Sequence, residues 1–203
     1  YEIVDNSVDE HLAGYCTEIR VTLEKDGSCT VSDNGRGVPV GMHAKGVPAA
    51  RLVYTTLHAG GKFDDSAYKT SGGLHGVGSS VVNALSAYMD VEISGDGYIH
   101  HDRYERGIPV VELEDGLLPK IGKTKRTGTK VNFLPDDTIF EKTRFRGEEV
   151  KSRMHETAYL NPSLTIIYED KRGAEPEKIT YHEPDGILGF IRELNEKKEA
   201  VHE

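Results

Sequence analysis

A glycine-rich stretch that runs directly into a helical pattern constrains this chain more than any other feature of its sequence. Residues 70–87 read TSGGLHGVGSSVVNALSA, with glycines at 72, 73, 76 and 78. Glycine reaches positive φ and lets a ligand approach the backbone, and a helix start offers unpaired N–H groups and the positive end of the helix dipole. The pattern therefore favours a loop that cradles an anion such as phosphate. Glycine spacing alone fits an ordinary flexible loop equally well.

The spacing differs from the common phosphate-binding motifs. The order G-x-x-G-x-G in GGLHGVG reverses the dinucleotide fingerprint, and Gly61-Lys62 is followed by Phe63, which excludes a Walker A loop. If the stretch binds a nucleotide, the sequence predicts a nucleotide fold of another kind.

Composition indicates one domain without a membrane segment. The 203 residues include 36% hydrophobic residues, enough for a core, and contain neither a bilayer-length apolar run nor a signal-like start. We therefore expect a cytoplasmic location. The formal net charge of -9 opposes direct DNA binding by this part of the chain, and the nine histidines lack zinc-site spacing. The lysine-rich segment, which contains Lys120, Lys123, Lys125, Arg126 and Lys130, is expected to be a solvated loop.

Hydrophobic periodicity predicts an α+β fold. Residues 1–14 place Val4, Val8 and Leu12 on one helix face, and Ile19, Val21 and Leu23 alternate before an Asp-Gly turn. Further helices are predicted at 47–58, 148–159 and 186–197, and strands at 90–94, 127–133 and 163–170. The order favours a two-layer sandwich, in which helices cover one face of a mixed, mostly antiparallel sheet.

The first helix also carries a polar stripe. Glu2, Asn6 and Asp9 lie in a narrow arc away from the apolar face. A carboxylate can act as a general base on water, and an amide oxygen is a ligand that Mg²⁺ accepts beside phosphates. A solvated helix face is the alternative interpretation, and it is the better one for an isolated stripe.

Asp33 ends the predicted hairpin in the sequence Asp33-Asn34-Gly35-Arg36-Gly37. Its carboxylate only accepts hydrogen bonds, so it would select adenine by the exocyclic amine. A turn-forming Asp explains this residue equally well on its own.

Together these segments resemble the GHKL ATPases. Glu2-xxx-Asn6, Asp33 to Gly37 and Gly73 to Gly78 follow the order of the N, G1 and G2 boxes of that superfamily. The stretches EIVDNSVDEHLAGY, DNGRGVPVG, LHAGGKFDDSAYKTSGGLHGVGSSVVNALS and TGTKVNF look like the ATPase domain of bacterial type II topoisomerase B subunits, and this resemblance covers nearly the whole chain. It implies the Bergerat ATP-binding fold over residues 1–195, with residues 196–203 as the start of a linker.

The resemblance also implies roles for individual residues. Glu2 would be the catalytic base, Asn6 the Mg²⁺ ligand, and Asp33 the adenine acceptor, supported through water by Thr129. Glu10 and Arg36 would pair at the rim of the pocket, beside Pro39. The remaining ATP-binding residues would be Gly35, Gly37, Lys62, Gly73, Leu74, His75, Gly76, Val77, Gly78 and Ser79.

Expectations about partners follow from the same resemblance. We expect ATP and Mg²⁺ as cofactors, and the B subunit of DNA gyrase as the protein type, with the B subunit of topoisomerase IV as the alternative. A holoenzyme would add the gyrase A subunit and DNA in a heterotetramer, with an ATP-dependent B-subunit dimer and no membrane partner. We expect this chain alone to be a monomer, because the dimerising arm and the transducer domain after residue 195 lie outside it. Less favoured alternatives are a GHKL kinase and an ATP-responsive binding module.

Overall fold

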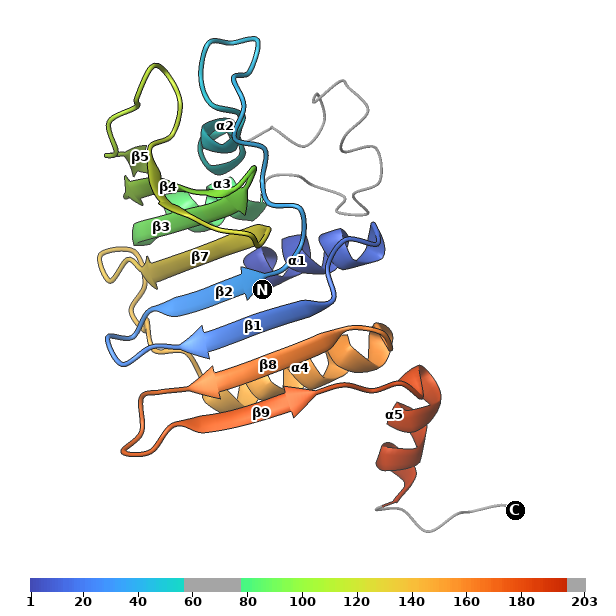
Figure 1. Cartoon of the computed structure of the whole chain (residues 1–203). Coiled ribbons are helices and arrows are strands. Elements are labelled where there is room, and N and C mark those ends of the chain that lie inside the picture. Colours follow the sequence, from blue (N-terminus) through green and yellow to red (C-terminus); the bar gives the residue numbers. More distant parts are fainter. Residues whose placement is uncertain (57–77, 197–203) are drawn as a thin grey trace.

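The computed structural model describes residues 1–56 and 78–196 of the chain (Figure 1). Within these residues the helices and strands form an α+β fold. Their bounds are α1 Glu2–Leu12, β1 Glu18–Leu23, β2 Cys29–Asp33, α2 Ala49–Thr55, α3 Gly78–Ala84, β3 Ser86–Gly95, β4 Tyr98–Glu105, β5 Ile108–Pro109, β6 Lys120–Lys123, β7 Gly128–Pro135, α4 Gly147–Leu160, β8 Thr165–Asp170, β9 Glu177–Tyr181 and α5 Gly186–Asn195.

The described strands form one sheet of nine, in the order β5-β4-β3-β7-β2-β1-β8-β9, and β6 pairs with β4. The predicted hairpin is present, because β1 and β2 pair antiparallel with Val21 opposite Val31. The parallel pair in this sheet joins β1 to β8, which follows α4 in the chain. A parallel neighbour needs a crossover connection, and α4 is part of that connection. The sheet is therefore mixed and mostly antiparallel, as predicted.

A stripe of valines crosses the centre of the sheet. Val21, Val31, Val131 and Val91 are opposite one another on β1, β2, β7 and β3, and each is at most 3% exposed. Side chains alternate between the two faces of a strand. On each of these strands, the residues directly before and after the valine therefore point to the other face of the sheet, which is polar. The sheet thus has one face that must be covered by other elements.

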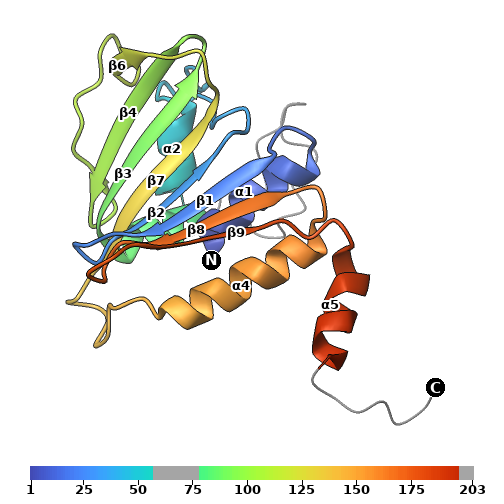
Figure 2. The ribbon, with the colours of Figure 1, turned by 60° about the horizontal axis from the view of Figure 1, so that its bottom comes forward.

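The helices cover that apolar face. Figure 1 and Figure 2 show α1 and α4 on the same side of the sheet, and Met154 and Ala158 of α4 are buried there. The fold is a two-layer sandwich with helices on one face, which confirms the predicted fold class. Helix α5 packs on α4 through Tyr159, whose hydroxyl donates to Glu193 at 2.5 Å.

Helix α2 is attached to the sheet by a buried ion pair. The Arg51 guanidinium donates to both carboxylate oxygens of Asp102 on β4, at 2.9 and 3.1 Å. Asp102 is 1% exposed and also accepts a hydrogen bond from the Tyr104 hydroxyl at 2.6 Å. Partners of this quality offset the cost of burying a charge.

Three sequence interpretations were wrong in detail. On α1 the apolar face is turned toward Ile3, Val4 and Ser7, and Leu12 is 65% exposed. Helix α2 begins only at Ala49, after Pro48, which lacks the N–H needed inside a helix. The lysine-rich segment expected to be a loop contains strand β6, Lys120–Lys123, which pairs with β4.

In the part of the chain that the structure describes, every helix is too short or too polar to span a lipid bilayer.

Candidate functional site

Consecutive residues of α1 bring together segments that are far apart in the sequence. Asn6 Nδ2 donates to Ser79 Oγ on α3 at 2.6 Å, and Ser7 Oγ donates to Asp33 Oδ2 at the end of β2 at 2.7 Å. The backbone N–H of Thr129, at the start of β7, lies 3.4 Å from Asp33 Oδ1. The predicted residues of α1, β2, α3 and β7 therefore meet at one end of the sheet.

The Asp33 carboxylate is held in a defined orientation. Oδ1 accepts from the backbone N–H groups of Gly35, at 2.9 Å, and Thr129, while Oδ2 accepts from Ser7. Burial raises the pKa of this carboxyl, although the same three hydrogen bonds oppose the shift. A carboxylate offers about four lone-pair positions, so one acceptor position is left for a ligand.

Glycines shape the backbone around Asp33. Gly128 has a φ of 144°, and a Cβ there would overlap the backbone oxygen of Asp33. A Cβ on Gly35 would lie 2.9 Å from Glu10 Oε2, and one on Gly37, at a φ of 85°, would lie 3.0 Å from the Ser94 carbonyl. Only glycine fits a positive φ together with such close approach.

Glu2 is exposed at the start of α1 and lies against the start of α3. A Cβ added to Gly78 would collide with the Glu2 carboxylate, and it would also approach Glu2 Cβ at 3.1 Å. The absence of a side chain at position 78 thus leaves room for the Glu2 carboxylate between the two helices. The last residue of the predicted glycine box and the predicted base are in direct contact.

The rim of the site contains the predicted ion pair. Arg36 Nη2 donates to Glu10 Oε1 at 2.8 Å, and its Nε donates to Oε2 at 3.2 Å. Burial alone would raise the pKa of Glu10, but the hydrogen bonds and charge of Arg36 outweigh it and lower that pKa. The guanidinium also lies 3.8 Å from the centre of the Tyr15 ring, a cation–π contact. Pro39 lies in the loop that follows Arg36 and is exposed.

Some predicted residues lie outside the described part of the chain. These are Lys62, Gly73, Leu74, His75, Gly76 and Val77. Their assignment to the phosphates remains a prediction.

Sequence reasoning missed Ser7, Tyr15 and Gly128. Ser7 gave a weak signal, since a serine that follows Asn6 lies about 100° further around the helix, toward the buried face. The preference for glycine at 128 arises from contact with Asp33, far away in the sequence, which no local pattern reveals. Thr129 was predicted to act through water, and its side chain hydroxyl accepts from the Val38 N–H at 3.1 Å.

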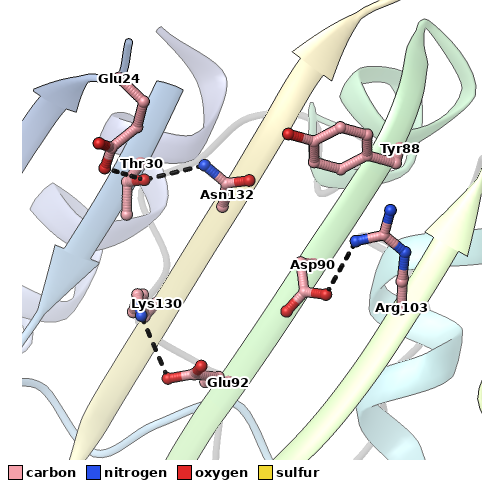
Figure 3. A pocket seen from close by; sticks show the side chains of 8 residues that line it. All are labelled: Glu24, Thr30, Tyr88, Asp90, Glu92, Arg103, Lys130 and Asn132. Carbon is pink, nitrogen blue, oxygen red and sulfur yellow. Dashed lines mark hydrogen bonds and ion pairs between the residues drawn. The ribbon is translucent and has the colours of Figure 1, made fainter. Parts of the chain in front are cut away.

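A hollow of about 460 Å³ lies away from these residues, on the polar face of the sheet (Figure 3). Most of its charged groups are already paired: Arg103 contacts Asp90 at 3.1 Å, and Lys130 contacts Glu92 at 3.4 Å. Paired charges leave few groups free to recognise a ligand, so we assign no function to this hollow. Its lining residues are Glu24, Thr30, Tyr88, Asp90, Glu92, Arg103, Lys130 and Asn132.

Comparison with known proteins identifies the family to which this chain is similar. Residues 1–139 match the family described as "Histidine kinase-, DNA gyrase B-, and HSP90-like ATPase". The chain is 52% identical over 202 residues to the B subunit of DNA topoisomerase 4 from Enterococcus faecalis, covering 99% of this chain and 29% of that protein. It is 51% identical over 204 residues to the DNA topoisomerase 4 B subunit from Staphylococcus aureus, covering 100% and 30%.

A solved structure is also similar. The 43K ATPase domain of Thermus thermophilus gyrase B, in complex with an aminocoumarin, superposes with a TM-score of 0.83 at 38% identity. The match covers 100% of this chain and 50% of that one. The chain thus spans about a third of the length of the curated relatives and half of the gyrase fragment.

Proposed function

We propose that this chain, which belongs to the histidine kinase-, DNA gyrase B- and HSP90-like ATPase family, hydrolyses ATP as the ATPase domain of a type II topoisomerase B subunit. One observation carries the assignment of the site. Neighbouring residues of α1, Asn6 and Ser7, bond respectively to Ser79, which directly follows the glycine box, and to Asp33, so α1, the end of β2 and the start of α3 meet at one place.

In this proposal Asp33 binds the exocyclic amine of adenine. Three of its acceptor positions are taken by Ser7, Gly35 and Thr129, and the remaining one accepts from the amine. Adenine carries a donor at this position, whereas a base with a carbonyl there would place an oxygen against the carboxylate. The site would therefore reject the carbonyl base by leaving a buried acceptor unpaired.

Glu2 would activate the attacking water. Its carboxylate lies beside Gly78, which is the last residue of the glycine box and the first residue of α3. A carboxylate there can accept a hydrogen bond from water and take its proton as the water oxygen bonds to the γ-phosphorus and the bond to the β-phosphate oxygen breaks. Free phosphate and ADP are the products. A transfer of phosphate to a protein histidine needs no such base, so this position of Glu2 favours hydrolysis.

Magnesium fits the chemistry of Asn6. Its Nδ2 is used by Ser79, no hydrogen bond to its Oδ1 is found among the described contacts, and the residue is exposed. A neutral amide oxygen is a hard ligand of the kind Mg²⁺ takes together with phosphates and waters. When bound, the ion would neutralise phosphate charge. Lys62 and the segment from Gly73 to Val77 complete the phosphate site in this proposal.

The protein type we now favour is the B subunit of topoisomerase IV. The sequence alone suggested the B subunit of gyrase, but relatives at 51–52% identity over the chain are topoisomerase 4 B subunits, whereas the gyrase B structure is 38% identical. Gyrase B stays as the second candidate because of its TM-score of 0.83. Either way, the partners we propose are the A subunit and DNA, with an ATP-dependent dimer of B subunits.

Two assays on the full-length protein test these proposals. With ATP and Mg²⁺, release of free phosphate supports hydrolysis, while radiolabel on protein would indicate a kinase and unchanged nucleotide a binding module. With the A subunit and DNA, unlinking of interlocked circles supports topoisomerase IV, and introduction of negative supercoils into relaxed plasmid would assign gyrase.

A further inference from the structure

We propose that Ser79 is a positioning residue for magnesium, because its hydroxyl fixes the amide of Asn6 with the oxygen available to the ion. This inference rests on the proposed function of Asn6 as the magnesium ligand and names a residue that acts through it. The carrying observation is the 2.6 Å contact from Asn6 Nδ2 to Ser79 Oγ.

The two ends of an asparagine amide do opposite chemistry. The nitrogen only donates, and the oxygen only accepts or ligates a cation. Because Oδ1 and Nδ2 point in different directions from the same carbon, holding Nδ2 on Ser79 presents Oδ1 away from that hydroxyl. Without a partner on its nitrogen, the amide would exchange between orientations, and an orientation with NH₂ toward the cation is repulsive.

Ser79 is placed to act as a fixed anchor, in contrast to the exposed Asn6. Ser79 is 5% exposed, so its side chain is surrounded by packed atoms. One turn further along α3, Asn83 Nδ2 donates to the Tyr54 carbonyl of α2 at 2.8 Å, and Asn83 is 1% exposed. Helix α3, which carries Ser79, is thus hydrogen-bonded to α2, and this contact holds the Ser79 backbone in place.

The contact also selects a state of the amide. In the structure the Ser79 hydroxyl accepts from Nδ2, so the amide already has the orientation that leaves Oδ1 for the ion. Mg²⁺ at Oδ1 excludes the reversed arrangement, and the bond from Nδ2 to Ser79 is then the compatible one. Ser79 therefore lowers the cost of binding the metal through its hold on the Asn6 amide.

The test is a magnesium titration of nucleotide affinity in the full-length protein. The β,γ-imido analogue of ATP is titrated calorimetrically, first in chelator and then at increasing Mg²⁺. Ser79→Ala should raise the Mg²⁺ concentration that gives half of the affinity gain by roughly three- to tenfold, the equivalent of one neutral hydrogen bond. Affinity in chelator should stay within about twofold of wild type, because without Mg²⁺ the hydrogen bond is present in both the free and the nucleotide-bound protein and its loss cancels.

Two further variants distinguish positioning from structure. Ser79→Thr keeps the hydroxyl and should restore most of the magnesium response. Ser86→Ala, which removes another buried hydroxyl near α3, one bonded to the Val82 carbonyl at 2.6 Å, should leave the response unchanged. In an Asn6→Ala background, Ser79→Ala should add nothing to the magnesium requirement, because the pair acts as a unit.

The inference is overturned if Ser79→Ala keeps the wild-type magnesium requirement, or weakens affinity equally with and without Mg²⁺. It is also overturned if Ser79→Thr fails to restore the response while its thermal unfolding midpoint matches wild type. A wild-type protein whose affinity is independent of Mg²⁺ would instead overturn the proposed magnesium site, and this inference with it.

Discussion

Replacing Asp33 by Asn tests the adenine site with a change of one atom. The variant keeps an oxygen at Oδ1, so the hydrogen bonds from Gly35 and Thr129 can persist. The new NH₂ group takes the place of Oδ2, where Ser7 now donates, and the Ser7 hydroxyl can rotate to accept instead. The substitution therefore changes what the site offers a ligand more than it changes the fold.

The expected loss of affinity follows from the number of acceptors. Wild-type Asp33 has one acceptor position left for a donor, whereas the asparagine of the variant would present an NH₂ group to the amine of adenine. A buried polar group left unpaired costs about 1–3 kcal/mol, which weakens the dissociation constant for ATP roughly 5- to 150-fold.

The same substitution should also change how the stability of the protein depends on pH. Burial raises the pKa of Asp33 above its ordinary 3.8, so the ionised carboxylate destabilises the folded state once the pH exceeds that value. The free energy of unfolding of wild type therefore decreases as the pH rises through the raised folded pKa of Asp33, and the variant Asp33→Asn lacks this decrease. The free energy of unfolding of the variant, relative to wild type, should increase from acidic to neutral pH.

Calorimetric titration with ATP and denaturant unfolding at several pH values measure both effects. Asp137→Asn is the matched control, since Asp137 is an exposed carboxylate beyond the end of β7. It should leave the affinity for ATP unchanged. An unchanged dissociation constant in folded Asp33→Asn would refute the adenine assignment.

Three further predictions concern other parts of the site. Glu2→Gln in the full-length protein should bind ATP normally but hydrolyse it roughly 10²- to 10⁴-fold more slowly, while Asp5→Asn on the same helix retains turnover; near-normal phosphate release by Glu2→Gln would show that the base is misassigned. Gly128→Ala should lower the free energy of unfolding, measured in urea, by at least about 1–3 kcal/mol, because the φ of 144° is strained for alanine and the added Cβ would overlap the Asp33 backbone oxygen. Gly122→Ala is the control and should cost less, because the nearest atom to its added Cβ is 3.7 Å away. Equal stability of the two variants would contradict this prediction. Glu10→Gln should lower the free energy of unfolding by under about 1 kcal/mol at pH 7. This difference from wild type should vanish as the pH falls below the ordinary pKa of 4.5 and through the lowered folded pKa of Glu10. A difference that persists in acid would rule out the ion pair as its cause.

Local sequence was sufficient for the elements that carry their own periodicity. The β1–β2 hairpin was predictable because Ile19, Val21 and Val31 alternate around an Asp-Gly turn, and pairing across such a turn is a short-range event. The fold class followed from the order of these elements. Strands β4 and β9 were missed, because their polar residues hide the alternation that half-burial normally produces.

Chemistry of the individual residues was also readable in advance. A carboxylate and an amide four residues apart on α1, and an Asp among glycines, suggested a base, a metal ligand and an amine acceptor before any contact was known. Each of these residues had an ordinary alternative explanation. The resemblance to a known family decided between the two, and the residues within 57–77 still rest on it alone.

What only the tertiary structure decided is how the residues are held. The contact from Ser7 to Asp33 spans 26 residues, that from Asn6 to Ser79 spans 73, and that from Thr129 to Asp33 spans 96. Periodicity and turn chemistry act over a few residues, whereas hydrogen bonds at these separations depend on how helices and strands pack. The sequence by itself determined which groups this protein brings to its site, and packing determined which atom of each group is left for a ligand.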